Sequence, residues 1–152
     1  MANTLRQATH GDLTAIIELA REMHDESPRF QRYAFLGYRL RTTLEATLNM
    51  GERGCLIVAE RDGRIIGAFA GVAVDHFACD VLQACDLGLF VAQDARGGTT
   101  AARLVRAYLD WAAGIKAEPT ISINTGVAVE RTGQLLAALG AKQSGISWTW
   151  GI

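Results

Sequence analysis

The stretch at residues 85–116 constrains the fold of this chain most strongly, because its apolar residues change period partway along. Leu87, Leu89 and Val91 alternate with other residues, as the side chains of a β-strand do. Beyond Arg96 the apolar residues recur at helical spacing, and they are Ala101, Leu104, Val105, Tyr108, Ala112 and Ile115. The stretch is therefore predicted to form a strand, a tight turn and a long helix.

The turn itself, Arg96-Gly97-Gly98-Thr99-Thr100, has the composition of an anion-binding turn. It offers two residues without Cβ, two hydroxyls and one cation at a helix start, where backbone N–H groups lack helical partners. Such N–H groups and the helix dipole together bind phosphate well. A plain strand-to-helix turn with Thr99 as the N-cap is the alternative that these residues leave open.

Two helices are expected before the main part of the sheet. Thr9 and Asp12 have the spacing of a capping box, and the helix that starts there is expected to end at Pro28. Leucines that recur every four residues predict a second helix over residues 36–50. A short strand is expected at residues 4–8.

The remaining periodicities complete an alternating pattern. Two β-rich runs, at residues 55–60 and 65–74, flank Asp62-Gly63, which indicates a hairpin. The other predicted elements are a loop at residues 75–83, a strand at 118–125, a helix at 130–139, and a strand or bent strand pair at 141–152. The order β-α-α-β-β-β-α-β-α-β describes an α/β (α+β) domain with a mixed sheet, in which the strand at 118–125 runs parallel to the one at 85–91.

Composition narrows the class of protein further. A chain of 152 residues fits one domain, so residues 1–152 are expected to form a single one. With 49% hydrophobic residues, 20% charged residues and a net charge of -1, neither a disordered chain nor a strongly basic nucleic-acid binder is indicated. No apolar run approaches the roughly 18 residues of a membrane span. The three cysteines lack metal-ligand spacing, so no metal is expected. Their number and apolar settings predict a reducing, cytoplasmic location.

The order of elements and the central turn resemble the GNAT superfamily of acyl-CoA-dependent N-acyltransferases, over nearly the whole chain. The family signature after its fourth strand has Arg or Gln, two variable residues, Gly, one variable residue, and Gly or Ala. Arg96-Gly97 and Ala101 are similar to this signature, whereas Thr99 replaces its middle glycine. The resemblance implies a mixed, centrally splayed sheet of six to seven strands with helices on both faces.

A second stretch of the family is similar to residues 135–141. Leu135, Leu139 and Gly140 match its Leu-Tyr-x-x-Leu-Gly-Phe pattern. Leu136 stands where many members carry the tyrosine that protonates the leaving thiolate, and Val129 where many carry a cofactor-binding asparagine.

The resemblance implies acetyl-CoA as co-substrate. The strand around Leu89, Phe90 and Val91 would pair through its backbone with the pantetheine arm, as an added strand does. The N–H groups of the turn would bind the pyrophosphate, and the residues concerned are Arg96, Gly97, Gly98, Thr99, Thr100 and Ala101.

Acyl transfer to an amine requires a base and an acid. Asp86, on the same strand, is the first candidate base, and His76 in the preceding loop is the second. With Leu136 in the tyrosine's place, an acid could come from water or from a hydroxyl, and the candidates are Tyr33, Tyr38, Tyr108 and Ser147. Of these, Tyr38 is retained as a catalytic candidate and Tyr108 is expected in the core.

In this architecture the acceptor is expected between the first two helices and the loop before the fourth strand. The candidate residues there are Arg29, Phe30, Tyr33 and Asp75, with Arg32, Arg39 and Asp80 nearby. The arginines favour a carboxylate or phosphate on the acceptor, whereas Asp75, Asp80 and Asp86 favour a cationic amine.

The leading hypothesis is an N-acetyltransferase that moves an acetyl group from acetyl-CoA to a primary amine of a small molecule or peptide, by direct attack in a ternary complex. Thr99, Val129 and Leu136 leave a second one open, a catalytically impaired acyl-CoA-binding or interaction module. A third, nucleic-acid binding through the arginines and aromatic residues of 29–41, is disfavoured by the net charge of -1. Trp148 and Trp150 alternate on the predicted terminal strand and suggest a homodimer.

Overall fold

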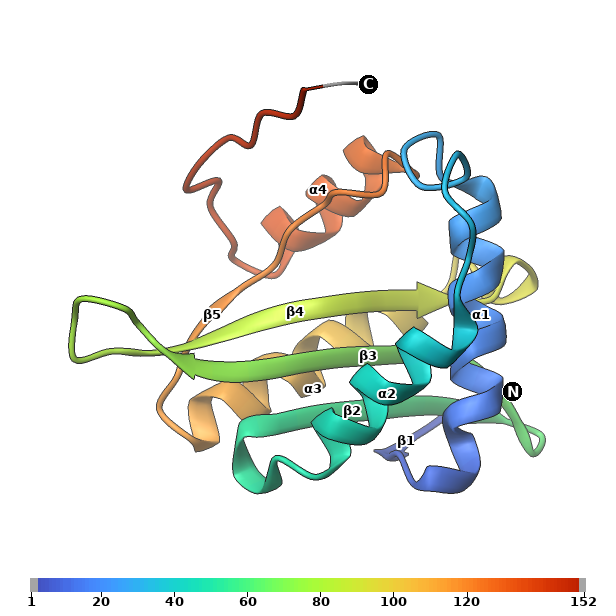
Figure 1. Cartoon of the computed structure of the whole chain (residues 1–152), viewed down its shortest axis with the longest axis horizontal. Coiled ribbons are helices and arrows are strands. Elements are labelled where there is room, and N and C mark those ends of the chain that lie inside the picture. The colour runs from blue at the N-terminus through green and yellow to red at the C-terminus, as the bar shows by residue number, and fades with distance from the viewer. Residues whose placement is uncertain (1–2, 151–152) are drawn as a thin grey trace.

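One mixed β-sheet forms the centre of the molecule (Figure 1). The computed structural model describes residues 3–150, and within them the sheet has five strands in the order β1-β2-β3-β4-β5. The first four strands pair antiparallel, whereas β5 runs parallel to β4. The strands are β1 Thr4–Gln7, β2 Gly54–Arg61, β3 Arg64–Asp75, β4 Leu82–Val91 and β5 Glu118–Thr120.

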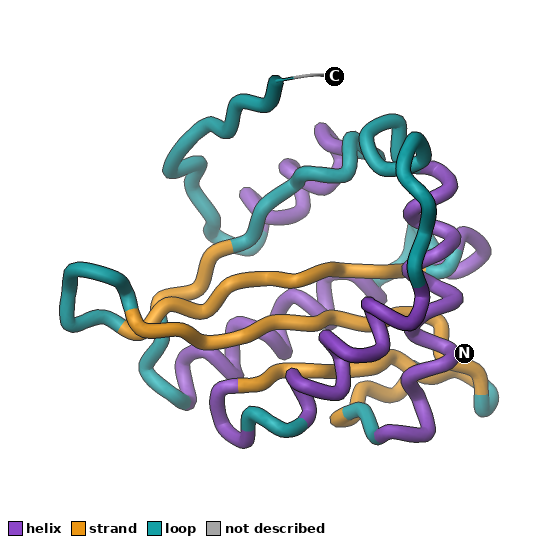
Figure 2. Tube along the Cα trace, in the orientation of Figure 1, coloured by secondary structure: helices purple, strands orange, loops and turns teal. Residues whose placement is uncertain are grey.

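Helices cover both faces of this sheet, as expected (Figure 2). The helices are α1 Leu13–Glu26, α2 Gly37–Leu48, α3 Thr100–Gly114 and α4 Val129–Ala138, with short 3-10 turns at His10–Asp12, Gly51–Arg53 and Gln93–Ala95. In the view of Figure 1, α1 and α2 lie in front of the sheet and α3 behind it. The α3 helix connects the parallel strands β4 and β5, which is the crossover that the sequence predicts. None of the helices within residues 3–150 has the length and hydropathy needed to cross a bilayer.

The predicted capping box is present at the first helical turn. The Thr9 backbone N–H donates to Asp12 Oδ2 at 2.7 Å, and the Arg6 guanidinium binds the same carboxylate from β1. This contact fixes the direction in which the chain leaves β1 and enters α1.

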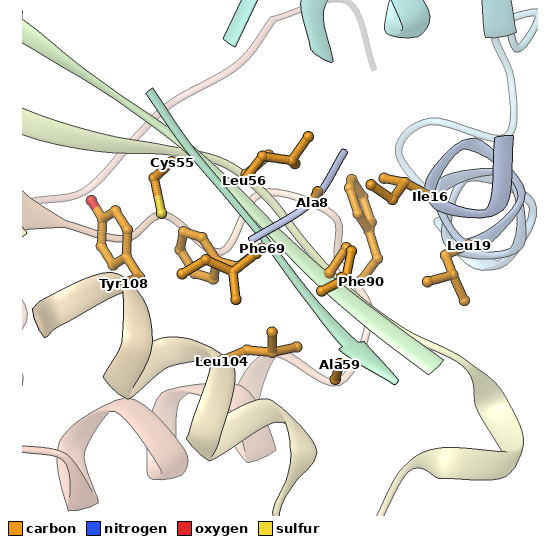
Figure 3. Close-up of a cluster of buried hydrophobic side chains, with 14 of the residues drawn as sticks. Ala8, Ile16, Leu19, Cys55, Leu56, Ala59, Phe69, Phe90, Leu104 and Tyr108 are labelled. Atoms are coloured by element: carbon orange, nitrogen blue, oxygen red, sulfur yellow. The ribbon is translucent and has the colours of Figure 1, made fainter. Parts of the chain in front are cut away.

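The hydrophobic core lies between the sheet and α3 on one side and between the sheet and α1 on the other (Figure 3). Tyr108 of α3 is fully buried and stacks on Phe69 of β3 with ring centroids 4.3 Å apart, so the prediction that Tyr108 belongs to the core is confirmed. A Cβ at Gly71 would lie 2.9 Å from the Tyr108 ring. Glycine is therefore required there for the close approach of the helix to the strand.

The predicted sheet of six to seven strands was wrong in number. Within residues 3–150 the sheet has five strands, because residues 141–150 extend from α4 without strand pairing. The final part of the predicted terminal strand, residues 151–152, lies outside the described residues. β5 also ends at Thr120, although the alternating pattern predicted a strand to residue 125. Pairing with β4 ends at this point.

Candidate functional site

The edge of β4 that faces β5 is open over half its length. The two strands pair only between Gln83–Cys85 of β4 and Glu118–Thr120 of β5. Immediately beyond, Ala70 of β3 pairs with Gly88 and Gly71 pairs with Asp86, so that Leu87 is an extra residue in β4. Such a β-bulge bends and twists its strand. The two strands diverge there, which leaves residues 86–91 of β4 without a partner on that side (Figure 1).

The backbone groups of Leu89 and Val91 point toward this opening. In an antiparallel ladder, consecutive residues direct their N–H and C=O groups alternately to opposite sides. The Ala92 N–H donates to the Ile66 carbonyl of β3 at 3.0 Å, so the preceding residue, Val91, faces away from β3. The Val91 carbonyl accepts instead from Arg96 Nε at 3.0 Å. The Leu89 N–H and the Val91 N–H are therefore free to donate to a ligand.

A cavity of about 500 Å³ occupies the gap between the diverging strands. Its wall is made by β4, the turn after it, the start of α3, the chain after β5, and α4. The lining residues are Met23, Phe30, Asp86, Leu87, Gly88, Leu89, Phe90, Val91, Ala95, Arg96, Gly97, Gly98, Ala101, Ala102, Ile121, Ser122, Ile123, Asn124, Thr125, Val127, Ala128, Arg131, Thr132 and Leu135. Most of the wall is apolar, with a few polar groups, as is usual for small-molecule sites.

The turn after β4 presents unpaired N–H groups to this cavity. Gly97 has φ +89°, a left-handed conformation that favours glycine, and a Cβ at Gly98 would meet nothing within 4 Å. The first helical bond of α3 runs from the Arg103 N–H to the Thr99 carbonyl, so the N–H groups at residues 100–102 have no helical acceptor. The Thr99 side chain makes no capping hydrogen bond, which argues against the alternative of a plain capped turn.

Two side chains of the turn form hydrogen bonds with residues outside it. The Arg96 guanidinium binds Glu26 of α1 through its two terminal nitrogens, Nη1 and Nη2, at 2.7 and 2.9 Å. This contact holds the pKa of that carboxyl below its usual range. The Thr100 side chain is buried and accepts from Asn3 at 2.6 Å. The Arg96 backbone N–H donates to the Gln93 carbonyl at 3.4 Å, so of these two residues only Thr100 can offer its N–H to a ligand. Both side chains hold the turn, Arg96 to α1 and Thr100 to the N-terminal segment.

Arg131 of α4 is a site residue that sequence reasoning missed. Its Nη2 lies 3.6 Å from the position a Cβ would take on Gly97, and it lines the cavity. Within residues 3–150 it has no ion-pair partner. Arg131 therefore supplies the free cation beside the turn. The helix predicted at residues 130–139 contains Arg131, but no sequence pattern indicated that this helix lies beside the turn.

Asp86 lies at the point where the two strands part. Its Oδ1 accepts from the Ser122 N–H at 2.9 Å, and it replaces the backbone acceptor that this N–H loses when the strands diverge. Burial raises the pKa of Asp86 above its usual value, and the Ser122 N–H offsets part of that rise. Among the described residues that line the cavity, Asp86 is the one carboxylate. It is therefore a half-buried carboxyl beside a free strand edge.

The segment between α1 and α2 closes one side of the cavity. Ser27 is fully buried, and its hydroxyl donates to the Thr125 carbonyl at 2.5 Å. A Cβ at Gly126, which has φ +74°, would lie 3.0 Å from Pro28. Arg29 Nη1 donates to the Asn124 carbonyl at 3.1 Å. Phe30 lies in the cavity wall next to these contacts, and the acceptor role predicted for it stays a prediction.

Seven predicted site residues do not line the cavity, and three of them, Arg29, Thr99 and Thr100, contact or adjoin residues that do. The other four are His76, Asp75, Tyr33 and Tyr38. His76 lies in the β3–β4 loop, where its Nδ1 accepts from the Ala78 N–H at 3.1 Å, and Asp75 is bound by Arg53 at 3.0 Å. Tyr33 and Tyr38 are exposed at 58% and 65%. The roles predicted for these four residues stay predictions. No group of three or more His, Cys, Asp or Glu within residues 3–150 is placed to hold a metal ion.

The chain is similar to a known protein family in sequence and to solved structures in fold. The sequence matches the model of the acetyltransferase (GNAT) family over residues 14–141. No protein of curated function matches it significantly in sequence.

Several solved structures share the fold at low sequence identity. Glucosamine-6-phosphate N-acetyltransferase from Arabidopsis thaliana superposes with a TM-score of 0.75 at 13% identity, covering 98% of this chain and 97% of that one. An aminoglycoside 6'-N-acetyltransferase from Acinetobacter haemolyticus gives a TM-score of 0.74 at 12% identity, with 98% and 97% covered. A ribosomal-protein-alanine N-acetyltransferase from Brucella melitensis gives 0.72 at 13%, with 99% of each chain covered. At these identities the likeness concerns the fold.

Proposed function

Because the chain belongs to the acetyltransferase (GNAT) family, we propose that it transfers an acetyl group from acetyl-CoA to a primary amine of a small molecule or peptide. The observation that carries this proposal is the free edge of β4 beside the turn at residues 96–98, both in the wall of one cavity. A strand edge can pair with an amide-containing chain, and unpaired N–H groups at a helix start can bind phosphates. The two lie in the order that the pantetheine and the pyrophosphate of CoA require.

Each part of the cofactor would have a separate partner. The backbone groups of Leu89 and Val91 would pair with the amides of the pantetheine arm. The N–H groups of Gly97, Gly98 and residues 99–101 would bind the pyrophosphate, and Arg131 would add a charge-assisted contact. Because the donors are backbone N–H groups, Thr99 can stand where the family has glycine.

The reaction needs a base that takes a proton from the amine and a hydrogen-bond donor that stabilises the negative charge on the carbonyl oxygen. Acetyl-CoA, when bound, supplies a thioester whose carbonyl carbon the amine attacks, so that a C–N bond forms and the C–S bond breaks. A free strand N–H, at Leu89 or Val91, would donate to the carbonyl oxygen as negative charge develops there. Asp86 would accept the amine proton, directly or through one water, since its raised pKa makes it a better base than an exposed carboxylate.

The donor of a proton to the sulfur is proposed to be water. Within residues 3–150 no tyrosine lines the cavity, and Leu136, in the family tyrosine's position, is buried. Tyr38 stays as the side-chain alternative, although it lies outside the cavity wall.

The proposal is tested by calorimetry with acetyl-CoA and by thiol release over a panel of amines. Binding together with amine-dependent thiol release is expected. Absence of binding would exclude the proposed function. Binding without release from any amine would instead favour the second candidate, an acyl-CoA-binding or interaction module, which the buried Leu136 supports.

We also propose a homodimer and retain the predicted cytoplasmic location. The support for a dimer is the exposure of Ile146, Trp148 and Trp150, at 73%, 77% and 88%, on a segment without strand partners. Apolar side chains so exposed usually contact another surface.

A further inference from the structure

The segment on the acceptor side of the cavity carries positive charges and no negative ones, and this excess indicates which charge the acceptor carries. Residues 27–44 contain four arginines and no aspartate or glutamate. The segment's first part, at residues 27–30, is the part held against the chain after β5 by the Ser27 and Arg29 contacts. Of these four arginines, Arg29 contacts the cavity wall, through the Asn124 carbonyl.

Asp75 and Asp80, two aspartates that could balance these cations, do not line the cavity. Asp75 is bound by Arg53 through both carboxylate oxygens, at 3.0 and 3.1 Å, and does not line the cavity. Asp80 lies in the same β3–β4 loop and is also absent from the wall. Glu26 is occupied by Arg96. Of the carboxylates that the sequence left in competition with the arginines, Asp86 lines the cavity, whereas Asp75 and Asp80 do not.

Arg29 does not line the cavity, but it contacts two residues that do, in a geometry that leaves donors free. One of its five N–H groups binds the carbonyl of Asn124, a residue of the cavity wall, and its guanidinium carbon lies 5.2 Å from the ring centroid of Phe30, another wall residue. Arg32 lies near it in sequence, 5.0 Å from the Tyr33 ring centroid. Neither arginine forms an ion pair within residues 3–150.

We propose that the acceptor amine carries an anionic group, a carboxylate or a phosphate, which Arg29 binds with support from Arg32. This inference rests on the proposed acetyl transfer and specifies its substrate class. An anion on Arg29 would turn the amine of the same molecule toward Asp86, which faces the cavity from β4. Carboxylate and phosphate both match the planar donor fork of an arginine.

The test compares amines that differ in the anionic group. One pair is β-alanine and β-alaninamide, and the other is phosphoethanolamine and ethanolamine. The anionic member is expected to have a kcat/KM at least about tenfold higher, which is the size of one charge-assisted contact. The pair with the larger ratio distinguishes a carboxylate from a phosphate.

Arg29→Gln should reduce that ratio about tenfold, because it should raise KM for the anionic amine more than for the neutral one, with acetyl-CoA binding retained. Arg29→Lys should restore part of the preference. Arg106→Gln is the matched control, because Arg106 lies on the exposed face of α3 and its loss changes the net charge equally. Since each pair is measured with both enzymes, differences in amine basicity cancel.

The outcomes separate this inference from the proposed function. Turnover of neutral and anionic amines at equal rates, or an unchanged ratio in Arg29→Gln, would overturn the acceptor class alone. If acetyl-CoA binds but none of the four amines reacts, calorimetric titration of the anionic amines into the acetyl-CoA complex decides, and no binding overturns the inference. Failure of acetyl-CoA itself to bind would overturn the proposed function and the acceptor class together.

Discussion

At the scale of single residues, Asp86 combines two roles that a substitution can separate. Its Oδ1 accepts from the Ser122 N–H across the diverging strands, and its ionised form is disfavoured by burial. An asparagine keeps an acceptor oxygen for Ser122 and cannot act as a base. Stability and catalysis are therefore expected to respond in opposite directions.

Asp86→Asn should lower kcat at least about 100-fold, the usual size of a lost general base, with acetyl-CoA affinity unchanged. In the wild type, kcat/KM should rise with pH through the pKa of Asp86, above its ordinary value of 3.8. Because the folded-state pKa is raised, the neutral form stabilises the fold below pH 3.8, and that gain is lost as pH rises through the raised pKa.

The variant, which carries no charge there, should consequently melt at the same temperature as the wild type or higher at pH 7. Steady-state kinetics and thermal melts measure both effects. A variant with normal kcat would rule out Asp86 as the base.

Arg131 gives a second residue-scale prediction. Arg131→Gln should raise the Kd for acetyl-CoA about tenfold, because one charge-assisted contact to a phosphate is lost. The difference between variant and wild type should shrink at high salt, since exposed charges are screened. Calorimetry at two ionic strengths measures this, with Arg106→Gln as the control for net charge. Equal affinities at low salt would contradict the role given to Arg131.

At the scale of elements, the two glycines of the turn differ in what they require. Gly97→Ala should cost about 1 kcal/mol of stability, because Gly97 has φ +89°, and should also weaken acetyl-CoA binding. Gly98→Ala should leave the melting temperature unchanged, since nothing lies within 4 Å of a Cβ there. If Gly98 provides the room for the pyrophosphate, its substitution weakens acetyl-CoA binding alone. Loss of stability in both variants would show that the turn needs two glycines for folding.

A second element-scale feature is the contact between α1 and the turn. Glu26→Gln should lower the free energy of unfolding by up to about 1 kcal/mol at pH 7, because it breaks a half-buried bidentate pair with Arg96. The pKa of Glu26 is lowered by Arg96, so its contribution is present above the ordinary value of 4.5 and is lost as pH falls through the lowered pKa.

Denaturant titrations of wild type and variant should therefore converge at acidic pH. Glu18→Gln on the same helix is the control, since its contact with Arg21, at 3.7 Å, is solvent-exposed and worth little. A similar loss in both variants would mean that the α1 contact has no special weight.

At the scale of the whole molecule, residues 141–150 offer an exposed apolar surface away from the cavity. Sedimentation at micromolar concentration should show a dimer, and replacing Trp148 and Trp150 with serine should shift it to monomer while acetyl-CoA binding is kept. A wild type that sediments as monomer would refute the dimer. A double variant that stays dimeric would instead rule out Trp148 and Trp150 as the interface.

How much the sequence predicted follows from the range of each interaction. The change of period at residues 85–116, the capping box at Thr9, the hairpin at Asp62-Gly63 and the mixed sheet are consequences of local patterns, and the structure confirms them. The turn at residues 96–98 was identified from glycines and hydroxyls beside a helix start. These features depend on residues a few positions apart.

The rest needed long-range contacts that no local pattern encodes. The alternation at residues 121–125 predicted a strand, but the bulge at Leu87 turns β4 away, and Asp86 takes the place of the missing backbone partner for Ser122. Arg131 joins the turn only because the tertiary structure brings α4 close to Gly97. The choice between arginines and aspartates at the acceptor side was likewise open in the sequence. The tertiary structure places the aspartates differently, since Arg53 binds Asp75 outside the cavity wall, whereas Asp86 lines the cavity.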